Sequence, residues 1–168
     1  MKNFTLKGLL LILCTSFLTS CAKDSIGEEV SSYDQTVTER LEYTYTDIET
    51  GILDEVNLYR RALNLPELTL MVNLSLESET HNKYMIEQGK VSHDNFTQRA
   101  SILMEAVRAR KVAENVGFGY RTSEAVVNAW LKSKGHRENI EGNFTHIGVS
   151  VRQDADGKNY FTNIFIKR

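Results

Sequence analysis

Residues 146–168, "HIGVSVRQDADGKNYFTNIFIKR", constrain the fold of this chain more than any other stretch. Apolar side chains alternate at Ile147, Val149 and Val151, and again at Ile164 and Ile166, on either side of "DADGK". Alternation is typical of a half-buried strand, and Asp-Gly between two such runs is a strong hairpin signal. We therefore expect an antiparallel hairpin at this end of the chain.

The residues before this hairpin have a helical pattern. Thr46 and Glu49 stand at capping-box spacing, so a helix is expected to begin near Asp47 and to end before Pro66. Its apolar positions recur every three or four residues, at Ile48, Ile52, Val56, Tyr59 and Leu63. Further helices are expected over about 74–88 (capped by Asn73, stopped by Gly89), near 96–110, and over about 123–134 (ended by Gly135). Helices followed by a closing hairpin indicate the α+β class.

Three side chains in these helices are expected to support the fold. Asn57 and Arg60 lie three apart on the first helix and are expected to tie it to the sheet or to a loop. Trp130 shares helical spacing with Val126 and Ala129, so it is expected in the core.

Length and charge limit the classes of protein that remain. A chain of 168 residues with 41% hydrophobic composition suits one globular domain. The formal net charge is −2, so the chain lacks the basic footprint of nucleic-acid binders and no nucleic-acid partner is expected.

The N-terminus has the pattern of an export signal. Lys2 and Lys7 precede the apolar run "GLLLILCTSFL" at 8–18, which is too short for a spanning helix. "LTSC" then resembles the lipobox of bacterial lipoproteins, with Cys21 as the lipidated residue; an ordinary secretory signal is the alternative. We expect a signal peptide over 1–20, the lipidated cysteine and a polar acidic tether over 21–46, and a folded domain over 47–168. "LEYTYT" at 41–46 leaves a short strand or docked extension open. The only other cysteine is Cys14, so no disulfide is expected.

Several separated stretches resemble one family. "VNLYR" with "LPELTL", then "VSHDNF", "AENVGFG", "AWLKSKGHRENI" and "NFTHIGVSV" are similar in order and spacing to the bacterial branch of the CAP superfamily, over about residues 48–168. The resemblance implies a three-layer α-β-α sandwich with a mostly antiparallel sheet. It also implies a shallow cleft lined by histidine and carboxylate that can bind a divalent cation, in which His93 and Glu114 match the first cleft histidine and carboxylate.

Two positions depart from the eukaryotic pattern of this superfamily. Ser133 stands where those members often have a second carboxylate, and Asn143 stands where they have a second histidine. The chain instead follows the bacterial "S-x-x-H-R-x-N-I" pattern, from Ser133 through His136 to Ile140. His136 is therefore expected to take over part of the lost ligand character.

His93, Glu114 and His136 together are the candidate site. Two histidines and a carboxylate can hold Zn²⁺, and imidazole alone can act as a general base. Each residue also has a structural reading: His93 can fill a polar pocket, Glu114 can accept backbone N–H bonds, and His136 can orient Ser133 or a carbonyl. His146 is a further cleft candidate, whereas His81 is expected to be a packed, hydrogen-bonded histidine. Ser133 with His136 lacks an identifiable third residue for a serine nucleophile.

Three functions fit this set of residues. The first is a lipid-anchored binding protein of the cell envelope, attached to the membrane through Cys21, whose cleft holds a divalent metal, a small ligand, a glycan or a protein. The second is a metal-assisted or histidine-driven hydrolase of peptides or envelope polymers. The third is a surface adhesion protein with a vestigial cleft. The incomplete ligand cluster favours binding over catalysis.

Overall fold

The computed structural model describes residues 42–168, which lie within one compact unit of the chain. The expected signal peptide and the lipidated Cys21 lie outside these residues. The described helices are α1 (Asp47–Ala62), α2 (Val72–Gln88), α3 (Phe96–Ala106), α4 (Ser123–Lys132) and α5 (Lys134–Glu141). The described strands are β1 (Thr69–Leu70), β2 (Lys111–Phe118), β3 (His146–Gln153) and β4 (Asn159–Lys167). None of the helices in this range has the length and apolarity needed to cross a membrane.

The predicted hairpin is confirmed and forms the centre of the sheet. β3 pairs antiparallel with β4 from His146 opposite Ile166 to Gln153 opposite Asn159. The strand order is β1-β3-β4-β2, with β2 antiparallel to β4 and β1 parallel to β3. The α+β class is therefore confirmed, but the sheet is mixed, because its shortest strand runs parallel to its neighbour.

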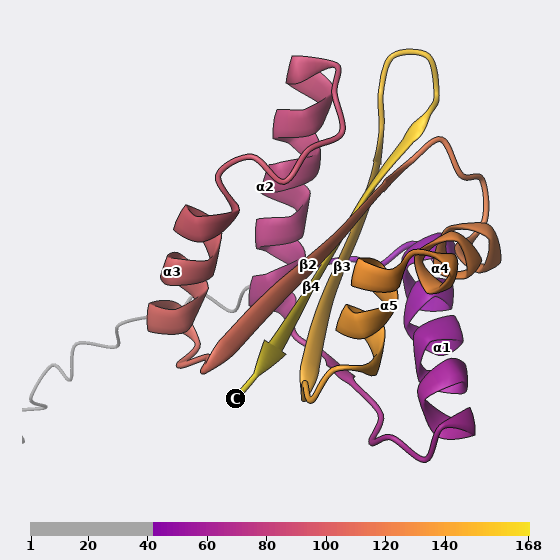
Figure 1. Ribbon diagram of the computed structural model, residues 1–168. Helices are drawn as coiled ribbons and strands as arrows, with labels where there is room; N and C mark the ends of the chain where they lie inside the picture. The colour runs from indigo at the N-terminus through magenta and orange to yellow at the C-terminus, as the bar shows by residue number, and fades with distance from the viewer. Residues whose placement is uncertain (1–41) are drawn as a thin grey trace, which may run out of the picture. The chain divides into compact units, whose positions relative to one another are not determined.

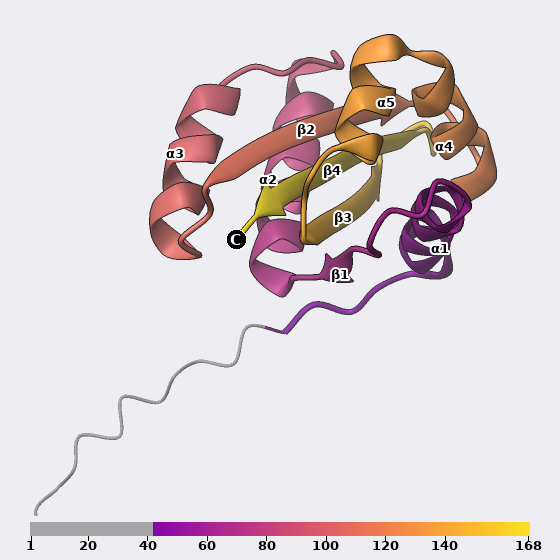
Figure 2. The same cartoon turned by 60° about the horizontal axis from the view of Figure 1, so that its bottom comes forward.

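Helices cover both faces of this sheet. Figures 1 and 2 show α2 and α3 on one face and α1, α4 and α5 on the other. Contacts agree with this view, since α2 packs on β3 and β4, α3 packs on β2, and α1 packs on β3 and α4. The alternation of the hairpin explains the two layers: Ile147, Val149 and Val151 belong to the core beneath α1, whereas Ile164 and Ile166 pack with Leu74 of α2.

The N-terminus of α1 is fixed to the sheet by a buried carboxylate. The predicted capping box is present, with Thr46 and Glu49 bonded reciprocally. Glu49 is fully buried and also accepts hydrogen bonds from the Val151 amide at 2.8 Å and from the Arg152 guanidinium at 2.9 Å. The Tyr43 hydroxyl donates to Glu49 at 2.7 Å, so the residues before α1 are docked on the domain rather than paired as a strand.

The far end of α1 is tied down as the sequence predicted. Asn57 exchanges two hydrogen bonds with the backbone of Leu68, and buried Arg60 donates to the carbonyls of Pro66, Ile140 and Gly142. Trp130 lies in the core, where its indole N–H donates to the Val116 carbonyl.

Several boundaries differ from the sequence prediction. Gly135 does not end a helix: α4 stops at Lys132, Ser133 is extended, and α5 begins at Lys134. The N-cap of α2 is Met71 rather than Asn73, and α3 ends at Ala106. The strand "KVAENVGF" was not predicted, because buried Glu114 and Asn115 interrupt the apolar alternation that identifies a strand.

Candidate functional site

Glu114 is the buried centre of the candidate site. It lies in β2, an edge strand of the described sheet, on the face covered by α2 and α3. Only 5% of the residue is exposed, although a carboxylate is costly to bury without partners. The side chains around Glu114 must therefore compensate its charge.

His93 provides one of these partners from the loop between α2 and α3. Its Nδ1–H donates to Glu114 Oε1 at 2.8 Å, while half of the His93 side chain remains exposed. Because Nδ1 carries the proton in this bond, the neutral ring presents Nε2 as an acceptor on its outer side. The carboxylate thus sets the orientation of the exposed imidazole.

Arg99 of α3 is a second partner, which the sequence pattern did not indicate. Its Nε donates to Glu114 Oε2 and its Nη2 donates to Oε1, both at 3.0 Å, and the residue is 6% exposed. A third donor, Nη1, bonds the Asp94 carbonyl at 2.7 Å. The only signal in the sequence is general: a buried glutamate needs a cation, and no rule of spacing singles out Arg99.

His81 lies beneath the same carboxylate and is closed off from solvent. Its Nε2 donates to the Ser92 carbonyl at 2.8 Å and lies 3.8 Å from Glu114 Oε1. Burial lowers the pKa of His81, so the ring is neutral at physiological pH. This is the packed, hydrogen-bonded histidine that the sequence predicted.

Helix α5 brings His136 to the other side of the site. Asn139 donates to the Glu114 carbonyl at 3.1 Å and to Asn115 Oδ1 at 2.9 Å, and Asn115 donates to the His136 carbonyl at 3.1 Å. These bonds dock α5 against β2 and place the ring centres of His136 and His93 6.3 Å apart. The structure therefore brings His93, Glu114 and His136 together, although they are widely separated in sequence.

The two remaining candidates have different positions. Ser133 lies at the junction of α4 and α5, and no hydrogen bond links it to His136 among the described residues. His146 begins β3, separated from β2 by β4, and its Nδ1 contacts the Thr145 hydroxyl at 2.9 Å. The structure thus does not form the serine–histidine pair and does not bring His146 to Glu114, because the strand order separates β3 from β2.

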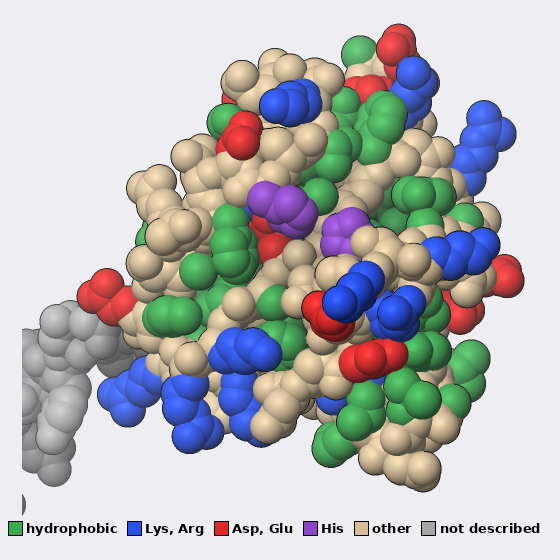
Figure 3. Space-filling view, viewed as in Figure 1, with side chains coloured by type: hydrophobic (Ala, Val, Ile, Leu, Met, Phe, Trp, Pro, Cys, Tyr) green, Lys and Arg blue, Asp and Glu red, His purple; other side chains and the backbone are tan. Residues whose placement is uncertain are grey.

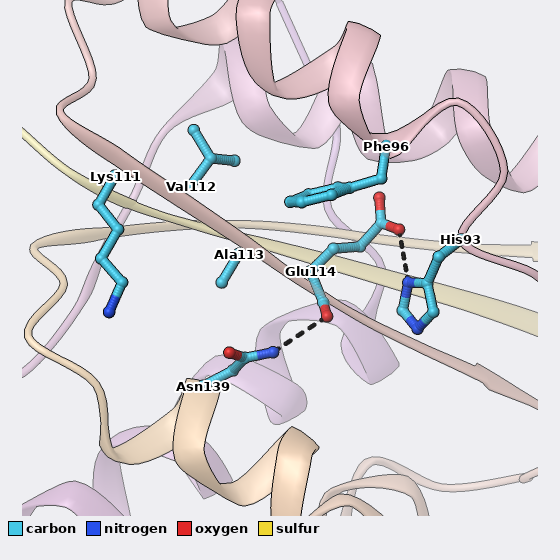
Figure 4. Close-up of a pocket in the computed structure, with 7 residues that line it drawn as sticks. All are labelled: His93, Phe96, Lys111, Val112, Ala113, Glu114 and Asn139. Carbon is cyan, nitrogen blue, oxygen red and sulfur yellow. Dashed lines mark hydrogen bonds and ion pairs between the residues drawn. The ribbon is translucent and has the colours of Figure 1, made fainter.

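A shallow hollow of about 300 Å³ lies over this arrangement. Its lining consists of His93, Phe96, Lys111, Val112, Ala113, Glu114 and Asn139. Figure 4 shows the Phe96 ring beside the Glu114 carboxylate, with His93 at one end of the hollow and Lys111 at the other. Figure 3 shows histidine side chains close together on this face, with acidic atoms beside them. The hollow thus combines apolar walls with polar groups at its rim.

The expected zinc set does not fit this geometry. Both oxygens of Glu114 are engaged by the Arg99 guanidinium, so the carboxylate is already neutralised by a cation. Within residues 42–168, no group of three His, Cys, Asp or Glu side chains is placed to hold a metal ion. Since protein zinc sites usually use at least three such ligands, His93 and His136 alone do not make one.

His136 is expected to titrate below an ordinary histidine. Burial lowers its pKa, and the nearby His93 lowers it further. Because the pKa of His136 is lower in the folded state, the unfolded chain binds more protons than the folded chain below about pH 6.5. The free energy of unfolding therefore decreases as pH falls from about 6.5 through the folded-state pKa of His136. An NMR titration of the His136 ring should give a midpoint below 6.5, and His93→Ala should raise it. A midpoint at or above the ordinary value in the wild type would contradict this expectation.

Comparison with known sequences gives one family. The sequence-family model described as "CAP: Cysteine-rich secretory protein family" matches residues 53–165. The protein YkwD of Bacillus subtilis (strain 168) is 31% identical over 105 residues, covering 60% of this chain and 41% of YkwD. The membrane protein YlbC of the same strain is 31% identical over 127 residues, covering 73% of this chain and 35% of YlbC. The chain therefore spans less than half the length of either relative.

Solved structures with the same fold include two bacterial proteins. An outer surface protein from Borrelia burgdorferi has a TM-score of 0.64 and 24% identity, with 76% of this chain and 99% of that chain covered. An extracellular protein containing an SCP domain from Bacillus anthracis str. Ames has a TM-score of 0.61 and 26% identity, with coverages of 76% and 45%.

Proposed function

Because this chain belongs to the cysteine-rich secretory protein (CAP) family, we propose that it is a binding protein whose hollow, lined by His93 and with His136 close to that ring, holds a polar ligand at the cell envelope. The observation that carries the proposal is the pair of imidazoles whose ring centres lie 6.3 Å apart, with the His93 ring lining the hollow. Glu114 orients the His93 ring, and the Asn115 and Asn139 bonds fix the backbone of α5 at His136.

The chemistry of the hollow favours a neutral or anionic ligand over a metal ion. The negative charge of Glu114 is already matched by Arg99, so the site has no surplus of negative charge to attract a cation. His93 Nε2 and the His136 ring offer hydrogen bonds to hydroxyl, amide or acidic groups, and Phe96 offers an apolar wall. Glycans and peptides carry such groups.

We place the protein at the cell envelope as part of the same proposal. Support comes from the lipobox-like "LTSC" ending at Cys21. It also comes from two structural relatives, one of which is called an outer surface protein and the other an extracellular protein.

The binding proposal predicts a localised response of the histidine rings. Addition of N-acetylglucosamine oligomers or short peptides to the full chain should shift the ring NMR signals of His93 and His136, and His93→Ala should abolish binding. His146→Ala is the matched control, because His146 lies in β3, which β4 separates from β2. This variant should bind the ligand as the wild type does. Equal binding by His93→Ala and the wild type would refute a ligand in this hollow. Titration with ZnCl₂ should show no stoichiometric binding.

A histidine-driven hydrolase is the second candidate, and His136 is the residue that favours it. Burial lowers its pKa, so it is neutral near pH 7 and able to accept a proton. Turnover of peptide or glycan substrates that is lost in His136→Ala would support this activity. Binding of the same compounds without turnover would leave the binding function alone.

A further inference from the structure

A group of basic side chains lies at one end of the sheet, beside the hollow. Arg108 and Arg110 precede β2, Lys111 begins it, and Lys167 ends the neighbouring strand β4. Lys111 and Lys167 are directly opposite each other in the antiparallel register. We call these four residues the basic patch.

The basic patch is not a consequence of composition. Residues 47–168 contain 16 basic and 16 acidic side chains, yet four of these cations occupy two adjoining strand ends. Within the described part of the chain, none of the four forms an ion pair with an Asp or Glu side chain. Like charges directly opposite each other on paired strands are destabilising, and no carboxylate side chain of the described residues offsets the repulsion between Lys111 and Lys167.

The head groups of the two lysines are nonetheless held at defined positions. Lys167 Nζ donates to Asn143 Oδ1 at 2.9 Å, and Lys111 Nζ lies 4.7 Å from the centre of the Phe144 ring. Neither neighbour carries a negative charge. These neighbours therefore do not neutralise the two ammonium groups, which can bind an anionic ligand.

The basic patch is continuous with the hollow. Lys111 belongs to both, since it lines the hollow together with His93 and Asn139. Figure 3 shows Lys and Arg side chains gathered on the same face as the histidines, and Figure 4 shows Lys111 at the opposite end of the hollow from His93. A path lined by cations and then by imidazoles thus crosses this face.

We propose that the basic patch and the hollow together bind a linear phosphate-bearing polymer. Lysine ammonium groups bind phosphate as point charges, and the arginines add planar donors. A polymer chain can follow the patch into the hollow, whereas a flat bilayer surface can reach only the patch. This proposal rests on the binding function of the hollow and specifies the class of its ligand.

Fluorescence anisotropy with fluorescein-labelled linear polyphosphate tests the proposal on the full chain. The double variant Lys111→Gln/Lys167→Gln should bind at least about tenfold more weakly, and the slope of log affinity against log salt should fall by about two. Arg121→Gln/Lys158→Gln removes the same charge beside the opposite ends of β2 and β4 and should bind within about twofold of the wild type. His93→Ala should weaken binding because the polymer also enters the hollow.

Two results would overturn the phosphate-polymer proposal. They are equal losses in the two double variants and absence of polyphosphate binding, whether or not the protein binds phosphatidylglycerol vesicles. The response of His93 to sugars and peptides separates this failure from that of the proposed function. If the protein does not bind polyphosphate but that response is present, the hollow binds ligands of another class and only the phosphate-polymer proposal is lost.

Discussion

Gly148→Ala is expected to destabilise the domain by at least about 3 kcal/mol, at the upper end of the cost of overpacking a core. A Cβ at this position of β3 would lie 2.2 Å from Leu74 Cβ and 2.5 Å from the Ser75 backbone nitrogen. A backbone cannot rotate away as a side chain can, so α2 would have to move off the sheet. Thermal unfolding should show a melting temperature lower by about 10 °C or more.

Gly135→Ala is the matched control for this substitution. Gly135 lies inside α5, and a Cβ there would meet nothing within 4 Å. Alanine should therefore stabilise the protein by about 0.5–1 kcal/mol, because glycine in a helix costs conformational entropy. A Gly148→Ala protein as stable as the wild type would show that α2 and β3 are not in close contact.

Glu114→Ala is expected to cost about 3–5 kcal/mol of unfolding free energy, because it leaves the buried Arg99 guanidinium without its carboxylate. The substitution also removes the acceptor that orients His93. Urea unfolding followed by circular dichroism measures the loss of stability. Broadened NMR signals of the His93 ring would report that the ring has lost its fixed orientation.

A second variant separates the buried charge from the fold. Arg99→Met/Glu114→Gln removes both partners and should recover much of the stability lost in Glu114→Ala. Glu138→Ala breaks an exposed contact of 3.9 Å with Lys134 and should remain close to the wild type. If Glu114→Ala were as stable as Glu138→Ala, the proposed role of Glu114 as the charged centre of the site would be wrong.

The site arises from contacts between three elements that do not adjoin in sequence. β2 provides Glu114, the loop after α2 provides His93, and α5 provides His136. The "HRENI" stretch explains how one short helix serves this purpose. His136 faces His93, Asn139 bonds the β2 backbone, and Ile140 is fully buried in the core.

The sequence by itself determined the elements that depend on near neighbours. The hairpin of β3 and β4 follows from alternation and an Asp-Gly turn, and the start of α1 follows from the Thr46–Glu49 capping box. It also singled out His93, Glu114 and His136 as candidates, through residue type and family resemblance. These signals are local or are carried by short motifs, so they can be read without coordinates.

Only the tertiary structure decided what surrounds Glu114. A carboxylate beside two histidines reads as a metal ligand in the sequence, but Arg99 occupies both of its oxygens. The sequence also left β2 and α5 unrecognised, because buried polar residues break the strand pattern and Gly135, expected to end a helix, lies inside α5. Such features depend on which side chains meet across the folded chain, and the pairing of Arg99 with Glu114 is fixed by the packing of α3 on β2.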